Sequence, residues 1–186
     1  SSFTGTEYGT CVNGTNSDTT KTAWAAGSYE NYYKWYVIVD GVYYTVEPVE
    51  VNATFQVDSV TALTTALTDA VDGDTIELAA GTYELSNQDV SASVTIKGIG
   101  NVIVKAAASQ NAFYVNGLAT GKTLTLENLN LVAHNTHAVQ MTVNCNGTVA
   151  IRNCTFTTAN GGYGIYKNPQ GTLEVTGCSF KDLSVA

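Results

Sequence analysis

The sequence predicts an all-β chain whose larger part is a right-handed parallel β-helix, a solenoid of about four coils. Three observations lead to this prediction. Charged residues make up 13% of the 186 residues, against roughly 25% in an ordinary soluble domain, so little charged helix surface is expected. Pro is rare, while Thr, Asn, Val and Tyr recur throughout and favour strands and tight turns. The third observation is an internal repeat of short strands.

The repeat has three close copies and one looser copy. The close copies begin at residues 124, 149 and 173, at steps of 25 and 24 residues, and the looser copy covers 94–101. Apolar residues of successive copies would stack along the axis at about 4.8 Å and form one continuous core, which is typical of a parallel β-helix. The four apolar columns are Leu124-Val149-Leu173, Leu126-Ile151-Val175, Leu129-Cys154-Cys178 and Leu131-Phe156-Phe180.

One repeat position holds only Gly and Asn, namely Gly98, Asn128, Asn153 and Gly177. These two residue types tolerate left-handed backbone, so a sharp turn and a stacked ladder of Asn side chains are expected there in every coil. The preceding position alternates in charge, which predicts a surface ladder of opposite charges across neighbouring strands. Its members are Lys97, Glu127, Arg152 and Thr176.

The chain is expected to have two parts. Residues 1–57 form a Tyr- and Trp-rich β extension, and 58–186 form the β-helix. Within the extension, Asp40-Gly41 lies between the strand-like segments 36–39 and 42–46. Because Asp-Gly between two β-rich segments is a strong turn signal, a β-hairpin is predicted there.

A single capping helix is predicted over about 59–71, with Asp58 or Ser59 as its N-cap and Gly73 as its stop. The sequence then runs DGDTIEL over 72–78 and GTY over 81–83. This order resembles the entry to pectin-lyase-like right-handed β-helix proteins, in which a short helix caps the first coil and a GDTI…GTY strand and turn follow. The resemblance covers about 58–186. It implies the fold more than a function, because this fold hosts lyases, hydrolases, esterases, phage tailspikes and adhesins.

Composition excludes some partners. The formal net charge is −8 and Arg152 is the single Arg, so the basic stripe that a nucleic-acid binder needs is missing. No apolar run approaches the length that spans a bilayer, so no membrane insertion is expected. Low charge with many Thr, Asn and Tyr favours an extracellular or cell-surface location.

The sequence lacks a complete set of residues for the chemistry that the resemblance implies. A glycoside hydrolase needs two carboxylates that flank one sugar bond, whereas Glu127 and Glu174 fall in different columns. Arg152 fits the charge ladder better than the proton-abstracting base of a lyase. We therefore expect a non-catalytic module that binds glycan or mediates adhesion. The alternatives are a fragment of a polysaccharide lyase or glycoside hydrolase whose catalytic coils are absent, and a structural stalk or tailspike-like segment.

The candidate binding site is a strip of aromatic and amide side chains on the second strand of each coil. Aromatic rings stack on the apolar faces of sugars, and amides and imidazoles bond their hydroxyls, so the expected partner is a polysaccharide or surface glycan. A purely structural role stays open, because Tyr is also a good strand residue. The strip consists of Asn111, Tyr114, His137, Gln140, Tyr163 and Tyr166.

Asp72 and Asp74 flank Gly73 and are the candidate ligands of a calcium ion, the one cofactor that the sequence raises. Calcium takes six or more oxygen ligands, and few other acidic residues are near in sequence. The structural alternative is a helix stop followed by a polar turn.

The four cysteines lack the paired spacing of a zinc site. Cys154 and Cys178 share an inward column and are expected to be buried thiols. A pairing of Cys11 with Cys145 is left open.

The chain ends soon after the fourth copy, without a visible capping helix. A bare last coil presents an edge that invites pairing, so further coils or another subunit are expected to dock at the C-terminal edge.

Overall fold

The computed structural model describes residues 35–39, 42–46 and 52–183, and the chain divides into two compact units, Ser1–Val51 and Asn52–Ala186. In the first unit, β1 (Trp35–Val39) and β2 (Val42–Val46) pair antiparallel, with Val39 opposite Val42. The predicted hairpin is thereby confirmed. Its turn residues and Cys11 lie outside the described residues.

The second unit begins earlier than the boundary at 57/58 that the sequence suggested. The segment Thr54–Val57 is a strand, β3, which pairs in parallel with β4 (Thr75–Leu78). It therefore belongs to the β-helix and not to an extension over 1–57. The helix between β3 and β4 interrupts the repeat period, which is why the sequence pattern did not include β3.

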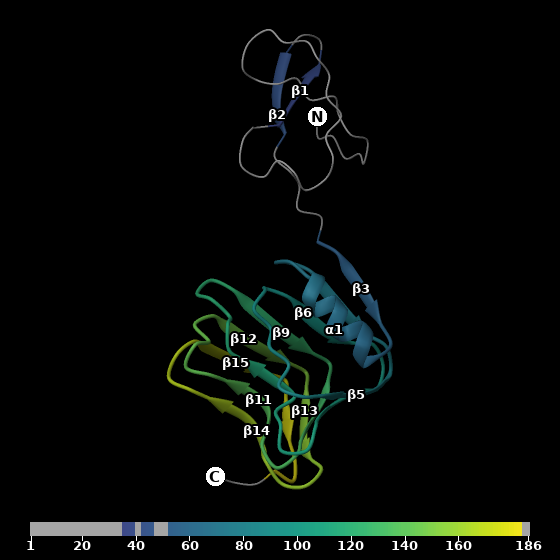
Figure 1. Ribbon diagram of the computed structural model, residues 1–186, viewed down its shortest axis with the longest axis vertical. Coiled ribbons are helices and arrows are strands. Elements are labelled where there is room, and N and C mark those ends of the chain that lie inside the picture. Colours follow the sequence, from purple (N-terminus) through teal and green to yellow (C-terminus); the bar gives the residue numbers. More distant parts are fainter. Residues whose placement is uncertain (1–34, 40–41, 47–51, 184–186) are drawn as a thin grey trace. The chain divides into compact units, whose positions relative to one another are not determined.

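Three parallel sheets run along the second unit and enclose one core, as Figure 1 shows. Their strand orders are β15-β12-β9-β6-β4-β3, β16-β13-β10-β7-β5 and β14-β11-β8. Strands β4, β6, β9, β12 and β15 each begin a coil, so the β-helix has about five turns, one more than predicted. The added coil is the one that starts at β4, whose sequence differs from the repeat copies. The strands not yet delimited are β5 (Gly81–Leu85), β6 (Thr95–Gly98), β7 (Val102–Ala106), β8 (Phe113–Val115), β9 (Thr123–Glu127), β10 (Asn130–Ala133), β11 (His137–Met141), β12 (Thr148–Arg152), β13 (Thr155–Thr158), β14 (Tyr163–Lys167), β15 (Thr172–Thr176) and β16 (Ser179–Phe180).

The predicted apolar columns form the core. Leu124 lies opposite Val149 and Leu126 opposite Ile151, and all four side chains are buried. The columns continue in register to the last coil. Side chains alternate between the two faces of a strand, so every second position of each strand contributes an inward column to the core.

The helix α1 (Val60–Asp69) covers the first coil. Ser59 is its N-cap, because the Ser59 Oγ accepts a hydrogen bond from Ala62 N at 3.2 Å. Leu63 and Ala66 are its buried residues, and α1 packs against β3, β4 and β5. The helix ends before Gly73, since the backbone is already extended at Ala70. In the described part of the chain, α1 is the one helix, and it is neither long nor apolar enough to cross a membrane.

The predicted left-handed turn occurs at Asn128, Asn153 and Gly177, with φ of 55°, 53° and 65°. The prediction is wrong for Gly98, where φ is not positive; the left-handed residue of that coil is Gly100, with φ of 84°. The turn from β6 to β7 is longer than the equivalent turns, and this moves the left-handed residue along the chain. Among the described residues no side-chain hydrogen bond joins Asn128 to Asn153. The backbone N–H of each of these residues donates to a backbone carbonyl of the next coil.

The charge ladder is in register, because Glu127 lies opposite both Lys97 and Arg152. These side chains do not form ion pairs. Within the described ranges the ion pairs are Lys105–Glu84 and Lys122–Asp72.

Candidate functional site

The strip of aromatic and amide side chains lies on the three-stranded sheet of β8, β11 and β14. The register places His137 opposite Tyr163, and Gln140 opposite both Tyr114 and Tyr166. Asn111 lies just before β8, within hydrogen-bond distance of His137. The structure thus brings the six residues of the strip together over three adjacent coils.

A local departure from alternation creates this strip. In each coil two inward residues separate the two positions of the strip: Ala112-Phe113, Ala138-Val139 and Gly164-Ile165. The outward side chains are consequently three positions apart, as in His137 and Gln140. A methyl group at Gly164 would lie 3.1–3.2 Å from the side chains of Leu183, Phe156 and Phe180, which would have to shift by a few tenths of an ångström to accommodate it.

Three aromatic rings form the centre of the strip. The His137 ring stacks on Tyr163, with centroids 5.5 Å apart and planes 25° apart, and its centroid lies 4.8 Å from that of Tyr166. Tyr163 and Tyr166 are 37% and 46% exposed, whereas His137 and Tyr114 are half-buried. No ring contact joins Tyr114 to the others in the described part of the chain. The rings of His137, Tyr163 and Tyr166 therefore make one continuous, partly exposed platform, which we call the aromatic platform.

Asn111 holds the platform from below. It is only 7% exposed, so it does not face a ligand as the sequence suggested. Its Oδ1 accepts a hydrogen bond from His137 N at 3.2 Å and lies 3.1 Å from His137 Nδ1. Its Nδ2 donates to Gln140 Oε1 at 3.0 Å. Asn111 therefore positions His137 and Gln140, and both of these side chains remain partly exposed.

Asn87 also belongs to this network and was not predicted from the sequence. Its Oδ1 accepts hydrogen bonds from both Asn111 N and Asn111 Nδ2, each at 2.9 Å. Asn87 has φ of 49°, and the neighbouring Gln88 forms a parallel bridge to Phe113, which extends the sheet by one coil. This coil has no recognisable repeat copy. The available signal was an Asn two residues after a strand that ends at Leu85, since Asn tolerates left-handed backbone.

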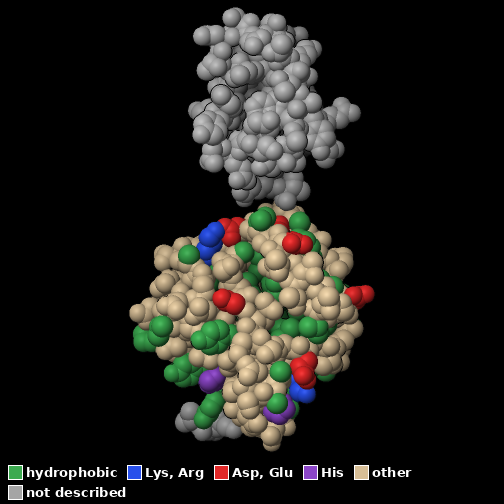
Figure 2. Space-filling model, in the orientation of Figure 1, with side chains coloured by type: hydrophobic (Ala, Val, Ile, Leu, Met, Phe, Trp, Pro, Cys, Tyr) green, Lys and Arg blue, Asp and Glu red, His purple; other side chains and the backbone are tan. Residues whose placement is uncertain are grey.

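The electrostatics of the site are those of uncharged groups. Burial lowers the pKa of His137 below its ordinary value, because desolvation penalises the imidazolium. Figure 2 shows few charged side chains, widely scattered, on the visible face of the described unit. The site can stack on apolar surface and exchange hydrogen bonds with hydroxyls, and it contains no pair of charged groups suited to acid–base chemistry.

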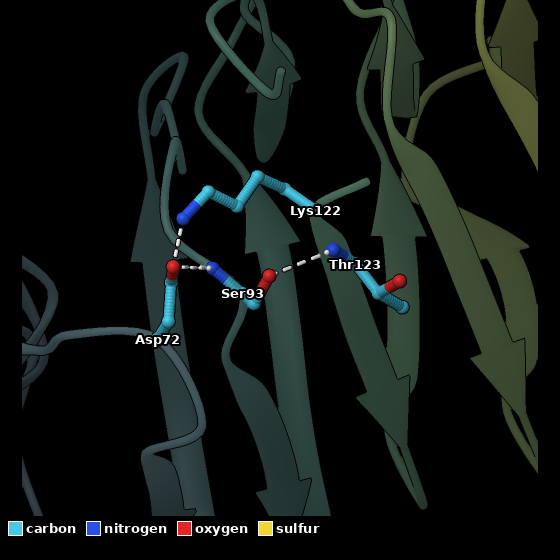
Figure 3. Close-up of polar contacts among 4 residues, drawn as sticks. All are labelled: Asp72, Ser93, Lys122 and Thr123. Atoms are coloured by element: carbon cyan, nitrogen blue, oxygen red, sulfur yellow. Dashed lines mark hydrogen bonds and ion pairs between the residues drawn. The ribbon is translucent and has the colours of Figure 1, made fainter. Parts of the chain in front are cut away.

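Asp72 and Asp74 lie outside this site, and their carboxylates already have protein partners. Asp72 Oδ1 accepts from Ser93 N at 2.8 Å and Oδ2 pairs with Lys122, while Ser93 Oγ accepts from Thr123 N at 3.0 Å (Figure 3). Asp74 Oδ1 and Oδ2 accept from Ala53 N at 2.7 Å and Val71 N at 2.8 Å. All four oxygens thus join neighbouring segments, and no group of three acidic, His or Cys residues is arranged for a metal within the described ranges.

The cysteines of the described unit are free thiols: Cys145 and Cys154 are buried and Cys178 is half-buried. Cys178 Sγ accepts from Cys154 N at 3.4 Å, as expected for stacked residues of one column. Burial raises the pKa of the Cys154 thiol to about 11, which makes it a poor nucleophile at neutral pH. These thiols serve the core and not the candidate site.

Comparison with known proteins supports the fold. No family model and no curated protein matches the chain. A solved structure of the PL6 family alginate lyase AlyGC is similar, with a TM-score of 0.56 and 22% sequence identity. The match covers 76% of this chain and 22% of that chain, so this chain spans about a fifth of its length. The likeness confirms the parallel β-helix fold that the pectin-lyase-like resemblance implied.

Proposed function

We propose that this β-helix is a carbohydrate-binding module whose ligand lies along the strip on β8, β11 and β14. The observation that carries the proposal is the aromatic platform: two exposed tyrosines and a histidine in ring contact, held by the buried amide of Asn111. Aromatic rings beside hydrogen-bonding groups form the usual surface for sugar rings, which are apolar on their faces and polar at their edges.

The geometry of the solenoid suits a repeating ligand. Strands of adjacent coils are about 4.8 Å apart, a spacing close to the length of one sugar residue in a chain. The register repeats the outward positions over three coils, from Tyr114 through Gln140 to Tyr166. A polysaccharide that crosses the strands can therefore meet an equivalent position on each coil.

The similar structure adds a further argument. That protein is an alginate lyase, which acts on a polysaccharide. A β-helix of the same kind with a platform for sugars fits a protein that meets polysaccharides outside the cell or at its surface, and we propose that location. The proposal is for binding alone, because the strip has no charged acid–base pair.

The test is to measure binding of the purified chain to a panel of soluble polysaccharides by affinity electrophoresis and calorimetry. Tyr166→Ala is expected to weaken binding by about 3- to 10-fold, the loss of one stacking contact, and Tyr163→Ala by a similar factor. Ile99→Ala is the matched control: Ile99 is 45% exposed, as Tyr166 is at 46%, but it lies in the turn between β6 and β7.

Binding that Ile99→Ala leaves unchanged and that both tyrosine variants weaken supports the proposed site. Binding that survives in both tyrosine variants places the ligand elsewhere and overturns the site. A chain that binds no polysaccharide in the panel overturns the proposed function.

A further inference from the structure

Two backbone donors establish the orientation of the amides beneath His137. The backbone N–H of His137 donates to Asn111 Oδ1, so that atom is an oxygen and not the amide nitrogen. The backbone N–H of Asn111 donates to Asn87 Oδ1, so this atom is an oxygen too. Asn111 Nδ2 then donates to Asn87 Oδ1 and Gln140 Oε1, which uses both of its protons.

This network decides which ring nitrogen of His137 carries the proton. His137 Nδ1 lies 3.1 Å from Asn111 Oδ1, an atom that can only accept hydrogen bonds. Two acceptors at that distance would repel, so Nδ1 must be protonated and donate. In the neutral ring Nε2 is then an acceptor. Nε2 has no hydrogen-bond partner among the described residues, and it is not fully buried.

The six residues of the strip include no charged side chain. On the elements packed against β11, the charged groups are Lys167 at the end of β14 and Lys105 on β7. Lys167 Nζ donates to the carbonyls of Asn168, Pro169 and Gln170, at 3.0–3.3 Å, and Lys105 pairs with Glu84 at 3.2 Å. A carboxylate on the platform would have to compete with these contacts for a cation, whereas an uncharged sugar meets no such cost.

We infer that the strip takes an uncharged polysaccharide and that His137 Nε2 accepts a hydrogen bond from one of its hydroxyls. This inference rests on the proposed function and adds the class of ligand and the residue that orients it. It separates this chain from the alginate lyase of similar fold, whose named substrate is acidic. Neutral glucans, mannans and xylans are the matching probes, and alginate and polygalacturonate are the acidic ones.

The first measurement needs no ligand. Two-bond ¹⁵N–¹H correlation spectra of the ¹⁵N-labelled chain at neutral pH distinguish the two histidine tautomers. A protonated Nδ1 and an unprotonated Nε2 at His137 are expected. The opposite tautomer would remove the acceptor and overturn the inference, whatever polysaccharide the chain binds.

The second measurement is affinity across the panel and across pH 5–8, near and below the ordinary histidine pKa of about 6.5. Binding to a neutral glycan is expected to be constant at the upper end and to weaken as pH falls below 6.5, because protonation converts Nε2 from acceptor to donor. The other titratable side chains on the elements packed against β11 are Tyr114, Tyr163, Tyr166, Lys105 and Lys167. His137→Phe keeps a ring for stacking and is expected to bind about fivefold more weakly, without the decline at acidic pH.

The outcomes separate the two proposals. Preference for alginate or polygalacturonate, or release of unsaturated uronate from them, overturns the inference about ligand class while polysaccharide recognition stands. Neutral-glycan binding that His137→Phe leaves unchanged at every pH overturns the role of Nε2. Failure to bind any polysaccharide overturns the proposed function, and this inference with it.

Discussion

Asn111 shows how the role of a residue depends on the coils above and below it. Its polar side chain before a strand predicted a surface residue that contacts a ligand. In the structure it is buried and forms hydrogen bonds with Asn87, His137 and Gln140. In a solenoid an amide can lie between equivalent positions of two neighbouring coils, where its donors and acceptors form hydrogen bonds with residues of those coils. Among the amide and imidazole groups of the strip, those of His137 and Gln140 are then left for a ligand.

Gly98 offers a test at the residue scale. A methyl group there would overlap the backbone oxygen of Asn128 and lie 3.2 Å from Leu129 Cδ2 and Val102 Cβ. We expect Gly98→Ala to lower the free energy of unfolding by about 2 kcal/mol, because the adjacent coil must move to make room. Urea denaturation followed by circular dichroism measures this change.

Gly81→Ala is the control for this substitution. Gly81 also lies in a strand and lacks positive φ, and the nearest atoms to a methyl group there are 3.9 Å away. Its effect should stay within about 0.5 kcal/mol. Equal effects of the two substitutions would contradict the close approach of the coils at Gly98.

At the scale of elements, Asp74 joins three segments at the start of the β-helix. Its side chain binds Ala53 N before β3 and Val71 N after α1, and Asp74 itself precedes β4. Asp72 performs a more exposed version of the same task, binding Ser93 N and Lys122. The DGD motif is thus a connector between the helix and the first coils, which agrees with the helix stop and polar turn given as the alternative to calcium.

These two acids should differ in their effect on stability. Asp74 is 2% exposed, so Asp74→Ala leaves two N–H groups without their acceptor, and a loss of about 3 kcal/mol in unfolding free energy is expected. The side chain of Asp72 is 42% exposed, so Asp72→Ala should cost no more than about 1 kcal/mol. Chemical denaturation of both variants measures the difference. A larger loss for Asp72→Ala would show that the ion pair with Lys122, and not the buried carboxylate, holds the junction.

At the scale of the whole β-helix, the two ends differ. The first coil is covered by α1. In the last coil Val175 is 41% and Phe180 is 50% exposed, although their counterparts Ile151 and Phe156 are fully buried. Phe180 stacks on Phe156 with centroids 4.7 Å apart and planes 5° apart, so the core column continues up to that end. Docking of further coils or another subunit at this edge stays a prediction.

Hydrogen exchange should reflect this difference. Strands β15 and β16 have a neighbouring coil on one side, whereas β12 and β13 have one on both sides. We expect the amides of β15 and β16 to exchange faster than those of β12 and β13, because opening the last coil breaks fewer contacts. Exchange measured by mass spectrometry on peptides from 148–158 and 172–180 tests this. Equal protection of the two peptides, at low and at high protein concentration, would contradict this expectation.

Much of the fold was predictable because stacked coils repeat their chemistry. The columns beginning with Leu124 and Leu126 and the left-handed turn at Asn128 and Asn153 could be read from the spacing alone. The coil that starts at β4 and the strand β3 were miscounted or missed, since a helix and turns of unequal length interrupt the period there. A periodic sequence pattern therefore reveals the coils whose connecting turns have equal length.

The sequence by itself determined the class of fold, the inward columns and the face that carries the strip. Side-chain alternation and the period are local properties, which explains why they can be read from the chain. Only the tertiary structure decided that Asn111 is buried, that Asn87 supports it, and that His137 presents Nε2. These facts depend on contacts between residues 24 to 29 positions apart, whose hydrogen bonds form only once one coil lies on the next.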